Sequence, residues 1–148
     1  MPARITLDGI AGVVPGMTPD EVERRWGVLL LLPDNVHSLG CRRAEIEAGA
    51  MRGHALFAED RLSAAIFNRG AVTDKGIRIG STLAALRRAY GARLTSRPAQ
   101  GASGGREYFV ARRAAPRWEL RFDVSRAGRV AQIGFGAAAL RGPNGCLD

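Results

Sequence analysis

Few residues of the chain have side chains and spacing that could serve in catalysis. Gly101-Ala102-Ser103-Gly104-Gly105 matches the G-x-S-x-G pattern of serine hydrolases, but a nucleophile elbow lies between a strand and a helix. Here the pattern comes before a predicted strand at residues 107–110, which favours a flexible hairpin loop. The glycines at positions 9, 12 and 16 lack the spacing and the lysine of a phosphate-binding loop and instead predict two turns.

Histidine and cysteine offer no clearer catalytic or metal site. His37 and His54 are the two histidines of the chain, which excludes a histidine-rich metal site. A Cys41/His54 pair is conceivable as an activated nucleophile, although Cys146 is the better partner for Cys41. We therefore expect a protein that is not an enzyme and that binds neither a metal nor a cofactor.

Cys41 and Cys146 are the two cysteines of the chain, and we expect them to form a disulfide that ties the C-terminal tail at residues 141–148 to the first half. A disulfide that closes a loop of about 100 residues contributes up to about 4.7 kcal/mol to the stability of the fold in the chain-entropy model. The bond requires an oxidising compartment. Because Met1-Pro2-Ala3-Arg4 lacks the apolar segment of a signal peptide, this hypothesis needs a secretion signal that has been removed. The alternative is two reduced core cysteines in a cytosolic protein.

Length and charge limit the remaining classes of function. A chain of 148 residues of which 46% are hydrophobic is long enough to bury about 68–70% of its unfolded surface, so we expect one folded region over residues 1–148. The apolar run at residues 28–32 ends at Pro33, far short of the ~20 residues of a membrane span. The net charge of +8 at pH 7 favours acidic partners.

An internal repeat is the clearest pattern in the sequence. Five identities recur at an offset of 64 residues, namely Gly12/Gly76, Gly16/Gly80, Thr18/Thr82, Arg24/Arg88 and Gly27/Gly91. Such a register predicts two copies of one supersecondary unit that share a core. We assign residues 5–70 to the first copy and residues 71–140 to the second.

Each copy is predicted to contain a short helix followed by strands. Thr18-Pro19-Asp20-Glu21 is a capping box for a helix that ends at Gly27. The second helix is capped by Ser81 or Thr82 and ends at Gly91.

The predicted strands follow from residue alternation and turn signals. In the first copy they cover residues 41–48, 53–58 and 61–67, with a turn at residues 59–60; in the second they cover residues 106–113, 117–124 and 129–136. The predicted fold is α+β, a tandem repeat of a short helix plus an antiparallel β-meander. The two units share one extended sheet, with the helices on one face.

The repeated segments resemble a known family. Gly16-Met17-Thr18-x-x-x-Val22-x-x-x-Trp26-Gly27 and its copy Gly80-Ser81-Thr82-x-x-x-Leu86-x-x-x-Tyr90-Gly91 look like the tandem units of the beta-lactamase inhibitor protein. They also resemble the small outer-membrane assembly lipoprotein domain of the SmpA/OmlA type. The second half is similar to uncharacterised bacterial secreted or periplasmic proteins. The resemblance implies a concave sheet that grips a protein partner, but it transfers no binding loop residue by residue.

Arginine doublets occur at residues 24–25, 42–43, 87–88 and 112–113 and could merge into a basic surface. Acidic residues interleave with arginines on the predicted outward face of residues 117–123, which is typical of a solvated sheet face. A protein-binding surface and a nucleic-acid-binding surface are the functional alternatives.

We therefore expect a periplasmic or secreted, non-enzymatic protein-binding module, most concretely an inhibitor or immunity-type protein. A structural module of the cell envelope is the next alternative. The expected partner is an acidic protein. The expected contact residues are Arg43, Arg112, Glu119 and Arg121, because strand alternation should point them outward. The alternative is a cytosolic nucleic-acid-binding protein that uses an arginine-rich surface.

Overall fold

The computed structural model of the chain describes residues 4–30, 41–99, 104–115 and 117–136. His37, Ser103, Cys146 and the tail at residues 141–148 lie outside this described part. The expectations stated for them, including the disulfide between Cys41 and Cys146, therefore stay predictions.

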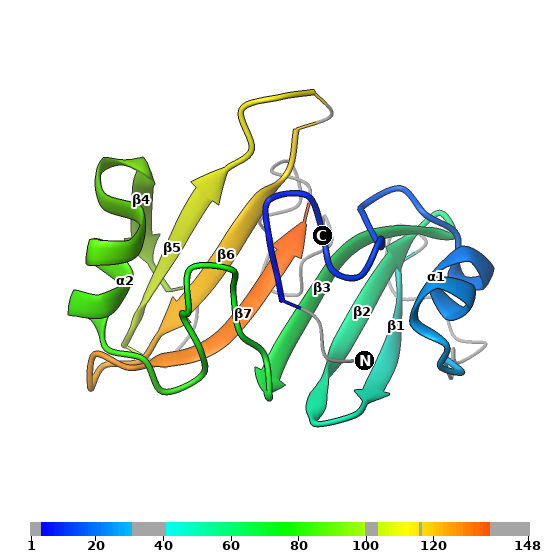
Figure 1. Cartoon of the computed structure of the whole chain (residues 1–148), viewed down its shortest axis with the longest axis horizontal. Helices are drawn as coiled ribbons and strands as arrows, with labels where there is room; N and C mark the ends of the chain where they lie inside the picture. The colour runs from blue at the N-terminus through cyan, green and yellow to red at the C-terminus, as the bar shows by residue number, and fades with distance from the viewer. Residues whose placement is uncertain (1–3, 31–40, 100–103, 116, 137–148) are drawn as a thin grey trace.

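Two α-helices and one seven-stranded sheet form the described part of the chain (Figure 1). The helices are α1 (Pro19–Trp26) and α2 (Leu83–Tyr90), and the short 3-10 helix η2 (Gly91–Arg93) follows α2. The strands are β1 (Cys41–Ala48), β2 (Met51–Ala58), β3 (Arg61–Arg69), β4 (Leu94–Pro98), β5 (Arg106–Ala111), β6 (Glu119–Val124) and β7 (Val130–Gly136). All neighbours in the order β1-β2-β3-β7-β6-β5-β4 are antiparallel. The predicted α+β class with one extended antiparallel sheet is confirmed.

The strands of the first half follow the prediction closely. β1 has the predicted bounds, while β2 begins at Met51 rather than residue 53 and β3 ends at Arg69 rather than residue 67. Glu59 and Asp60 form the predicted turn with φ values of 52° and 59°. Positive φ at both residues matches the right-handed twist of the two flanking strands.

The second half departs further from the prediction. β5 ends at Ala111 and β6 begins at Glu119, because the amide of Arg112 donates to the carbonyl of Trp118 at 2.8 Å and closes a loop between the strands. The sequence does not predict β4, which is five residues long and ends at Pro98. β4 is an edge strand, where a proline is tolerated, and its hydrogen bonds come from β5.

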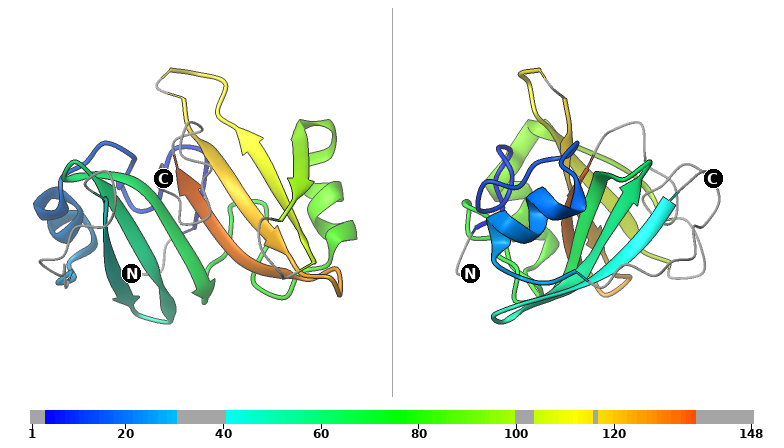
Figure 2. Two further views of the ribbon diagram at one scale, coloured as in Figure 1. Left: turned by 180° about the vertical axis from the view of Figure 1, so that it is seen from behind. Right: turned by 90° about the vertical axis from the view of Figure 1, so that its right-hand side faces the viewer.

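Both helices pack against the same face of the sheet (Figure 2). Val22 and Trp26 of α1 and Leu86 and Tyr90 of α2 are buried in one core with alternate strand residues. Those strand residues include Ala55, Phe57, Phe67, Val110, Leu120, Phe122, Ile133 and Phe135. Because successive strand side chains point to opposite faces, the remaining ones lie on the other side of the sheet, which we call the far face. Neither described α-helix has the length and apolar character of a membrane span.

α1 and α2 begin in the same way. The hydroxyl of Thr18 accepts a hydrogen bond from the amide three residues later at 3.3 Å, and the hydroxyl of Thr82 does the same at 3.1 Å, as an N-cap should. Two residues before each cap, Gly16 and Gly80 have φ values of 97° and 94°, which glycine adopts without strain. The chain therefore turns into both helices with the same local geometry.

The same two glycines join each helix start to a central strand. The amide of Gly16 donates to the carbonyl of Leu62, and the amide of Gly80 donates to the carbonyl of Val130, both at 2.7 Å. Leu62 belongs to β3 and Val130 to β7, the two strands that pair across the middle of the sheet. Each helix start is thus fixed to one of these strands.

Candidate functional site

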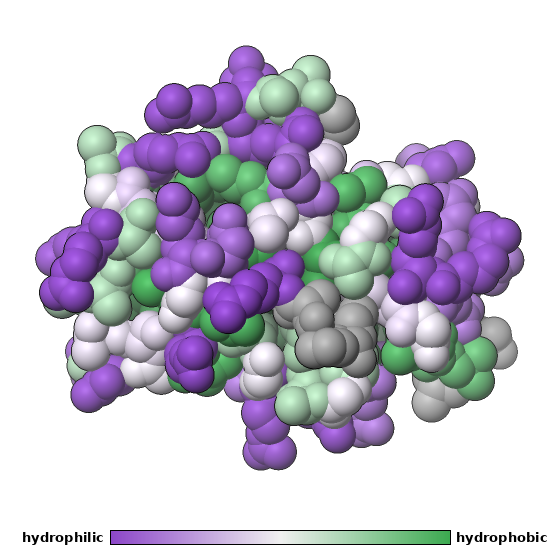
Figure 3. All heavy atoms as spheres, in the orientation of Figure 1, coloured by the Kyte–Doolittle hydropathy of each residue, from purple (hydrophilic) through white to green (hydrophobic). Residues whose placement is uncertain are grey.

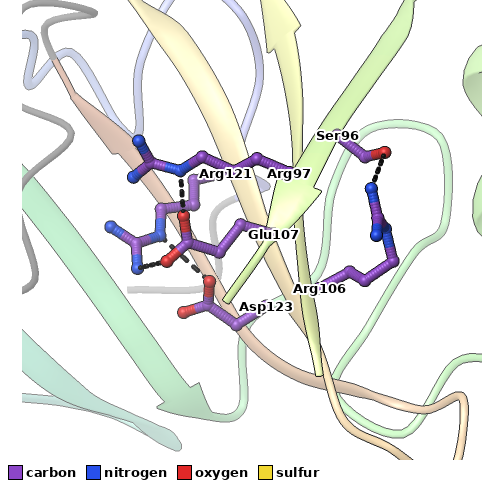
Figure 4. Close-up of polar contacts among 6 residues, drawn as sticks. All are labelled: Ser96, Arg97, Arg106, Glu107, Arg121 and Asp123. Atoms are coloured by element: carbon purple, nitrogen blue, oxygen red, sulfur yellow. Dashed lines mark hydrogen bonds and ion pairs between the residues drawn. The ribbon is translucent and has the colours of Figure 1, made fainter. Parts of the chain in front are cut away.

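Four charged side chains lie together on the far face of β4, β5 and β6. Arg97 is opposite Glu107 in the β4–β5 register, and Arg121 is opposite Phe109 in the β5–β6 register. Asp123 follows Arg121 by two residues and therefore shares its face. We call Arg97, Glu107, Arg121 and Asp123 the charged cluster (Figure 4).

Ion pairs connect all four members of the charged cluster. Nε of Arg97 lies 2.6 Å from one carboxylate oxygen of Glu107, and Nη2 of Arg121 lies 3.0 Å from the other. Nε of Arg121 lies 3.0 Å from an oxygen of Asp123. Both oxygens of Glu107 are therefore engaged, each by a different guanidinium group (Figure 4).

Glu107 is the most enclosed member of the cluster. Its side chain is 5% exposed, against 28% for Arg97 and 16% for Arg121. Removing a carboxylate from water costs roughly several kcal/mol unless opposite charges compensate, and here two arginines do so. The guanidinium of Arg97 also lies 5.3 Å from the ring centre of Phe109, a cation–π distance. The burial of Glu107 therefore depends on both arginines staying in place.

Asp123 has a perturbed acidity. Burial raises the pKa of its carboxyl; Arg121 opposes this rise through its charge and its hydrogen bond, and the charge of Glu107 adds to it. A buried carboxyl with a raised pKa is typical of a functional site, although structural ion pairs also perturb pKa values.

A hollow of about 440 Å³ lies beside the charged cluster. Glu107, Arg121 and Asp123 line it together with residues from β3, β7 and the strand ends, which are Asn68, Ala99, Arg106, Val124, Ser125, Ala131 and Gln132. Carboxylates accept hydrogen bonds, guanidinium groups donate them, and amides do both. The hollow therefore presents donors and acceptors side by side.

The structure does not bring the four expected contact residues together. Arg121 belongs to the charged cluster, whereas Arg43 lies in β1 at the far edge of the sheet and Arg112 lies in the loop after β5. Glu119 is only 4% exposed, so the expectation that alternation points it into solvent is wrong. Alternation assigns a side chain to one face of a sheet, but it does not say how deeply that face is covered.

Arg43 marks a second, more exposed charged group on the far face of the first half. Its Nε lies 3.0 Å from Glu45, and the two side chains are 50% and 67% exposed. His54 is opposite Glu45 in the β1–β2 register. Burial lowers the pKa of His54 and Arg43 lowers it further, while Glu45 partly offsets both.

The arginine doublets do not merge into one basic surface. Residues 24–25 end α1 and residues 87–88 end α2, and the two helices lie at opposite ends of the sheet (Figure 1). Residues 42–43 lie in β1, and residues 112–113 lie in the loop after β5. The doublets are spread over the molecule because the sheet separates the elements that carry them.

The catalytic candidates are not assembled in the part of the chain that the structure describes. His54 is opposite Glu45, four positions beyond Cys41 in β1, which places the two about 13 Å apart along the ladder. Gly104 and Gly105 lie between β4 and β5, which are antiparallel neighbours; residues 101–103 lie outside the described part of the chain, so the expected hairpin loop there stays a prediction. The described residues include no group of three His, Cys, Asp or Glu side chains placed to hold a metal.

Sequence patterns do not identify Arg97 and Glu107 as members of a site. Arg97 lies in a strand that the sequence does not predict, and Glu107 lies in the predicted strand at residues 106–113. The one available signal is the alternation of Glu107 with Phe109, which puts a carboxylate on the same face as a large apolar side chain. The strand neighbours that pair with Glu107 are set by the sheet register, which no local pattern gives.

The likeness of this chain to known proteins is one of fold. No protein-family model and no curated protein sequence matches it. YjgB, a DUF4309 family protein from Bacillus subtilis, has a TM-score of 0.49 and 17% identity over 81% of this chain and 78% of its own. A cysteine-rich secretory protein from Staphylococcus aureus has a TM-score of 0.50 and 10% identity over 84% of this chain. The match covers 43% of that protein, so the chain is similar in fold to part of a bacterial secretory protein.

Proposed function

We propose that the protein is an exported, non-enzymatic module that binds another protein through the far face of its sheet. An inhibitor or immunity-type role is the most concrete form of this proposal, and a structural role in the cell envelope is the second. The observation that carries it is the charged cluster beside the hollow (Figure 4).

Paired, enclosed charges suit recognition better than they suit stability. Replacing a buried ion pair by apolar residues of similar volume is often neutral or stabilising, so stability alone gives little reason for the charged cluster. Fixed charges at a surface select partners whose own charges are complementary and raise the rate of encounter. The cluster and the hollow therefore fit a polar, charged patch on a partner protein.

The same atoms provide little for catalysis. Guanidinium groups such as those of Arg97 and Arg121 donate hydrogen bonds and accept none, and these two hold both oxygens of Glu107. Among the residues that line the hollow, Ser125 is the one with a hydroxyl, and this hydroxyl accepts the amide of Arg129 at 3.3 Å. We expect no turnover on ester, phosphoester, peptide or glycosidic substrates.

We further propose that residues 5–70 and 71–140 are two copies of one unit. The matching caps at Thr18 and Thr82 support this proposal. The equal hydrogen bonds from Gly16 to β3 and from Gly80 to β7 support it as well. The resemblance to the tandem units of the beta-lactamase inhibitor protein then gives the reason to look for a partner on the sheet.

Export is the part of the proposal that thiol chemistry can test. The fold of the staphylococcal secretory protein and the paired cysteine count support it. Protein from an oxidising compartment, unfolded without reduction, should show no free thiol because Cys41 and Cys146 are joined. Two titratable thiols would contradict the disulfide and weaken the argument for export.

Partner capture followed by reconstitution tests the binding role. The tagged protein is incubated with an envelope extract of its native host and, separately, with nucleic acid, and any captured protein is purified and titrated back. We expect an acidic protein that binds in a defined ratio and less tightly as salt rises, because exposed charges are screened beyond about 8 Å at physiological ionic strength.

A substitution that fills the hollow locates the binding surface. Asn68→Phe places a ring where Asn68 lines the hollow and should lower partner affinity by about tenfold or more if the hollow is central to the interface. Ala84→Phe on the exposed surface of α2 is the matched control; both positions are exposed, so both variants should fold. Unchanged binding by Asn68→Phe, or recovery of nucleic acid with a steep salt dependence, would favour another surface or the nucleic-acid alternative.

A further inference from the structure

The loop between β5 and β6 projects beyond the rest of the molecule (Figures 1 and 2). Its described residues, 112–115 and 117–118, include Arg112, Arg113 and Arg117. We call residues 112–115 and 117–118 the arginine loop. It lies at the opposite end of β5 and β6 from Arg106 and Asp123 and is not part of the hollow.

Arg112 is bound within the fold on several sides. Its Nε and Nη2 each lie 3.3 Å from one carboxylate oxygen of Asp8, and its Cζ lies 4.5 Å from the ring centre of Trp118. Nη1 donates to the carbonyl of Ala114 at 3.0 Å. The side chain thus connects the two ends and the middle of the arginine loop, and it is a positioning residue rather than a contact.

Trp118 fixes the loop to a distant part of the chain. It is 5% exposed, and its Nε1 donates to the carbonyl of Leu7 at 2.6 Å. Leu7 and Asp8 lie in a turn closed by hydrogen bonds of 3.0 and 3.1 Å between Thr6 and Gly9. Because the loop is held before any partner arrives, less conformational entropy is lost on binding.

Arg113 and Arg117 remain free to meet a partner. Both are exposed, and neither forms an ion pair with another described residue. Ala114 and Ala115, which lie between them, are also exposed and are too small to shield them. Hydrophilic residues lie beside weakly hydrophobic ones where the loop projects (Figure 3).

We propose that the arginine loop is a preformed contact element for an acidic segment of a protein partner, with Arg113 and Arg117 as the contact residues. This inference rests on the proposed protein-binding function and names the chemistry of the partner. Guanidinium groups bind carboxylates through paired, charge-assisted hydrogen bonds. Single-stranded nucleic acid would need exposed aromatic rings for base stacking, whereas Trp118 is buried under Arg112, so the loop fits carboxylates of a protein.

The first test uses a short glutamate-rich peptide as the probe, titrated at low salt and followed by calorimetry and by NMR shifts of the loop amides. Arg113→Ser/Arg117→Ser should weaken binding by about tenfold, the equivalent of ~1.4 kcal/mol. Arg87→Ser/Arg88→Ser removes the same charge from exposed positions of α2 and should weaken it by about twofold or less, since these charges are distant and screened. Equal losses in the two variants, or no shift in the loop amides, would overturn the proposal.

The second test separates a preformed loop from simple charge attraction. Asp8→Ala raises the net positive charge by one, so attraction alone predicts tighter binding of the acidic peptide. The proposal predicts binding weaker by about two- to fivefold, because an exposed ion pair that stabilises by up to ~1 kcal/mol is lost from the loop. The Asp8 side chain is 83% exposed, so the variant should fold. Tighter binding would contradict the proposal.

A third test measures how the purified natural partner binds to variants of the arginine loop and of the hollow. It distinguishes the arginine loop from the far face as the binding surface. If the purified natural partner is insensitive to Arg113→Ser/Arg117→Ser but is lost with Asn68→Phe, the far face is the interface and the arginine loop is not. If a single-stranded oligonucleotide shifts the loop amides more strongly than the peptide at equal salt, the loop recognises nucleic acid and the proposal is wrong.

Discussion

α1 and α2 both end in an aromatic residue, Trp26 and Tyr90. The two residues differ in the hydrogen bonding of their polar atoms. Nε1 of Trp26 donates to the carbonyl of Ile10 at 3.0 Å, whereas the buried hydroxyl of Tyr90 forms no hydrogen bond of standard geometry among the described residues, although Thr73 lies near it. Both rings pack on a strand phenylalanine, with ring centres 6.2 Å apart for Trp26 and Phe67 and 5.4 Å apart for Tyr90 and Phe122. The position thus requires a large ring, and the polar atom is secondary.

The far faces of the two halves differ more strongly. In the first half, Arg43 and Glu45 form a pair that is at least half exposed. In the second half, Glu107 is enclosed between two arginines. Exposed pairs contribute little because water already solvates both charges. The charged side chains on the far face are therefore exposed to solvent in the first half of the sheet and enclosed by ion pairs in the second.

Breaking the enclosed arrangement should have the largest effect. Glu107→Gln removes the carboxylate charge that Arg97 and Arg121 share and leaves Asp123 as the one acid of the cluster, so we expect a loss of about 3–5 kcal/mol in the free energy of unfolding. Glu45→Gln in the exposed pair should cost ~1 kcal/mol or less. Urea denaturation measures both, and equal losses would remove the difference between the two far faces.

Substitutions of Trp26 and Tyr90 should change the free energy of unfolding by smaller amounts and in opposite directions. Trp26→Phe removes one of the two donors to the carbonyl of Ile10, which keeps the amide of Val13 at 2.9 Å, so it should destabilise the fold by about 0.5–1.5 kcal/mol. Tyr90→Phe removes a buried hydroxyl that forms no hydrogen bond of standard geometry, so it should be neutral or stabilise by up to ~1 kcal/mol. Thermal and urea unfolding of the two variants provide the comparison. A loss in Tyr90→Phe as large as that in Trp26→Phe would show that the hydroxyl is satisfied after all.

The first turns of α1 and α2 differ in charge, and one substitution can introduce the charge of α1 into α2. The first turn of α1 carries Asp20 and Glu21, and the first turn of α2 carries no acidic residue. Ala84→Asp places a carboxylate in α2 at the position equivalent to Asp20, near the positive end of the helix dipole. We expect a gain of about 0.3–1 kcal/mol that shrinks as salt is added. A gain that is independent of salt would point to another cause.

The smallest predicted effect concerns pH. Because the folded state lowers the pKa of His54, mainly through burial and then through Arg43, the unfolded chain binds the proton more readily. The contribution of His54 to stability is therefore present above about pH 6.5, the usual pKa of histidine, and is lost as the pH falls. Asp123 has the opposite sign, because its raised pKa favours folding at low pH. His54→Gln should flatten the fall in stability between about pH 7 and pH 5, as measured by urea unfolding across that range; an unchanged slope would remove this role.

The 64-residue offset in the sequence finds one set of matching contacts in the two halves and misses another. Nη1 of Arg61 donates to the carbonyl of Gly16 at 2.9 Å, and Nη1 of Arg129 donates to the carbonyl of Gly80 at 3.1 Å. These arginines are 68 residues apart, whereas the two glycines are 64 apart. A fixed offset finds matching residues only while the two halves keep the same spacing, and the second half contains the additional strand β4.

Features that depend on neighbouring residues can be predicted from the sequence alone. The cap at Thr18, the end of α1 before Gly27, the turn at Glu59 and Asp60 and the bounds of β1 all follow from side chains a few positions apart. Their hydrogen bonds and dihedral preferences are local, so a pattern of residue types is enough to predict them.

Contacts between residues that are distant in the chain depend on the fold of the whole sheet. The β4–β5 and β5–β6 registers place Arg97 and Arg121 on either side of Glu107, and the contact of Arg112 with Asp8 spans 104 residues. Alternation placed Glu119 on the correct face but not at its depth of burial. Strand order, register and burial result from the packing of the whole sheet around one core, and that packing has no local signature in the chain.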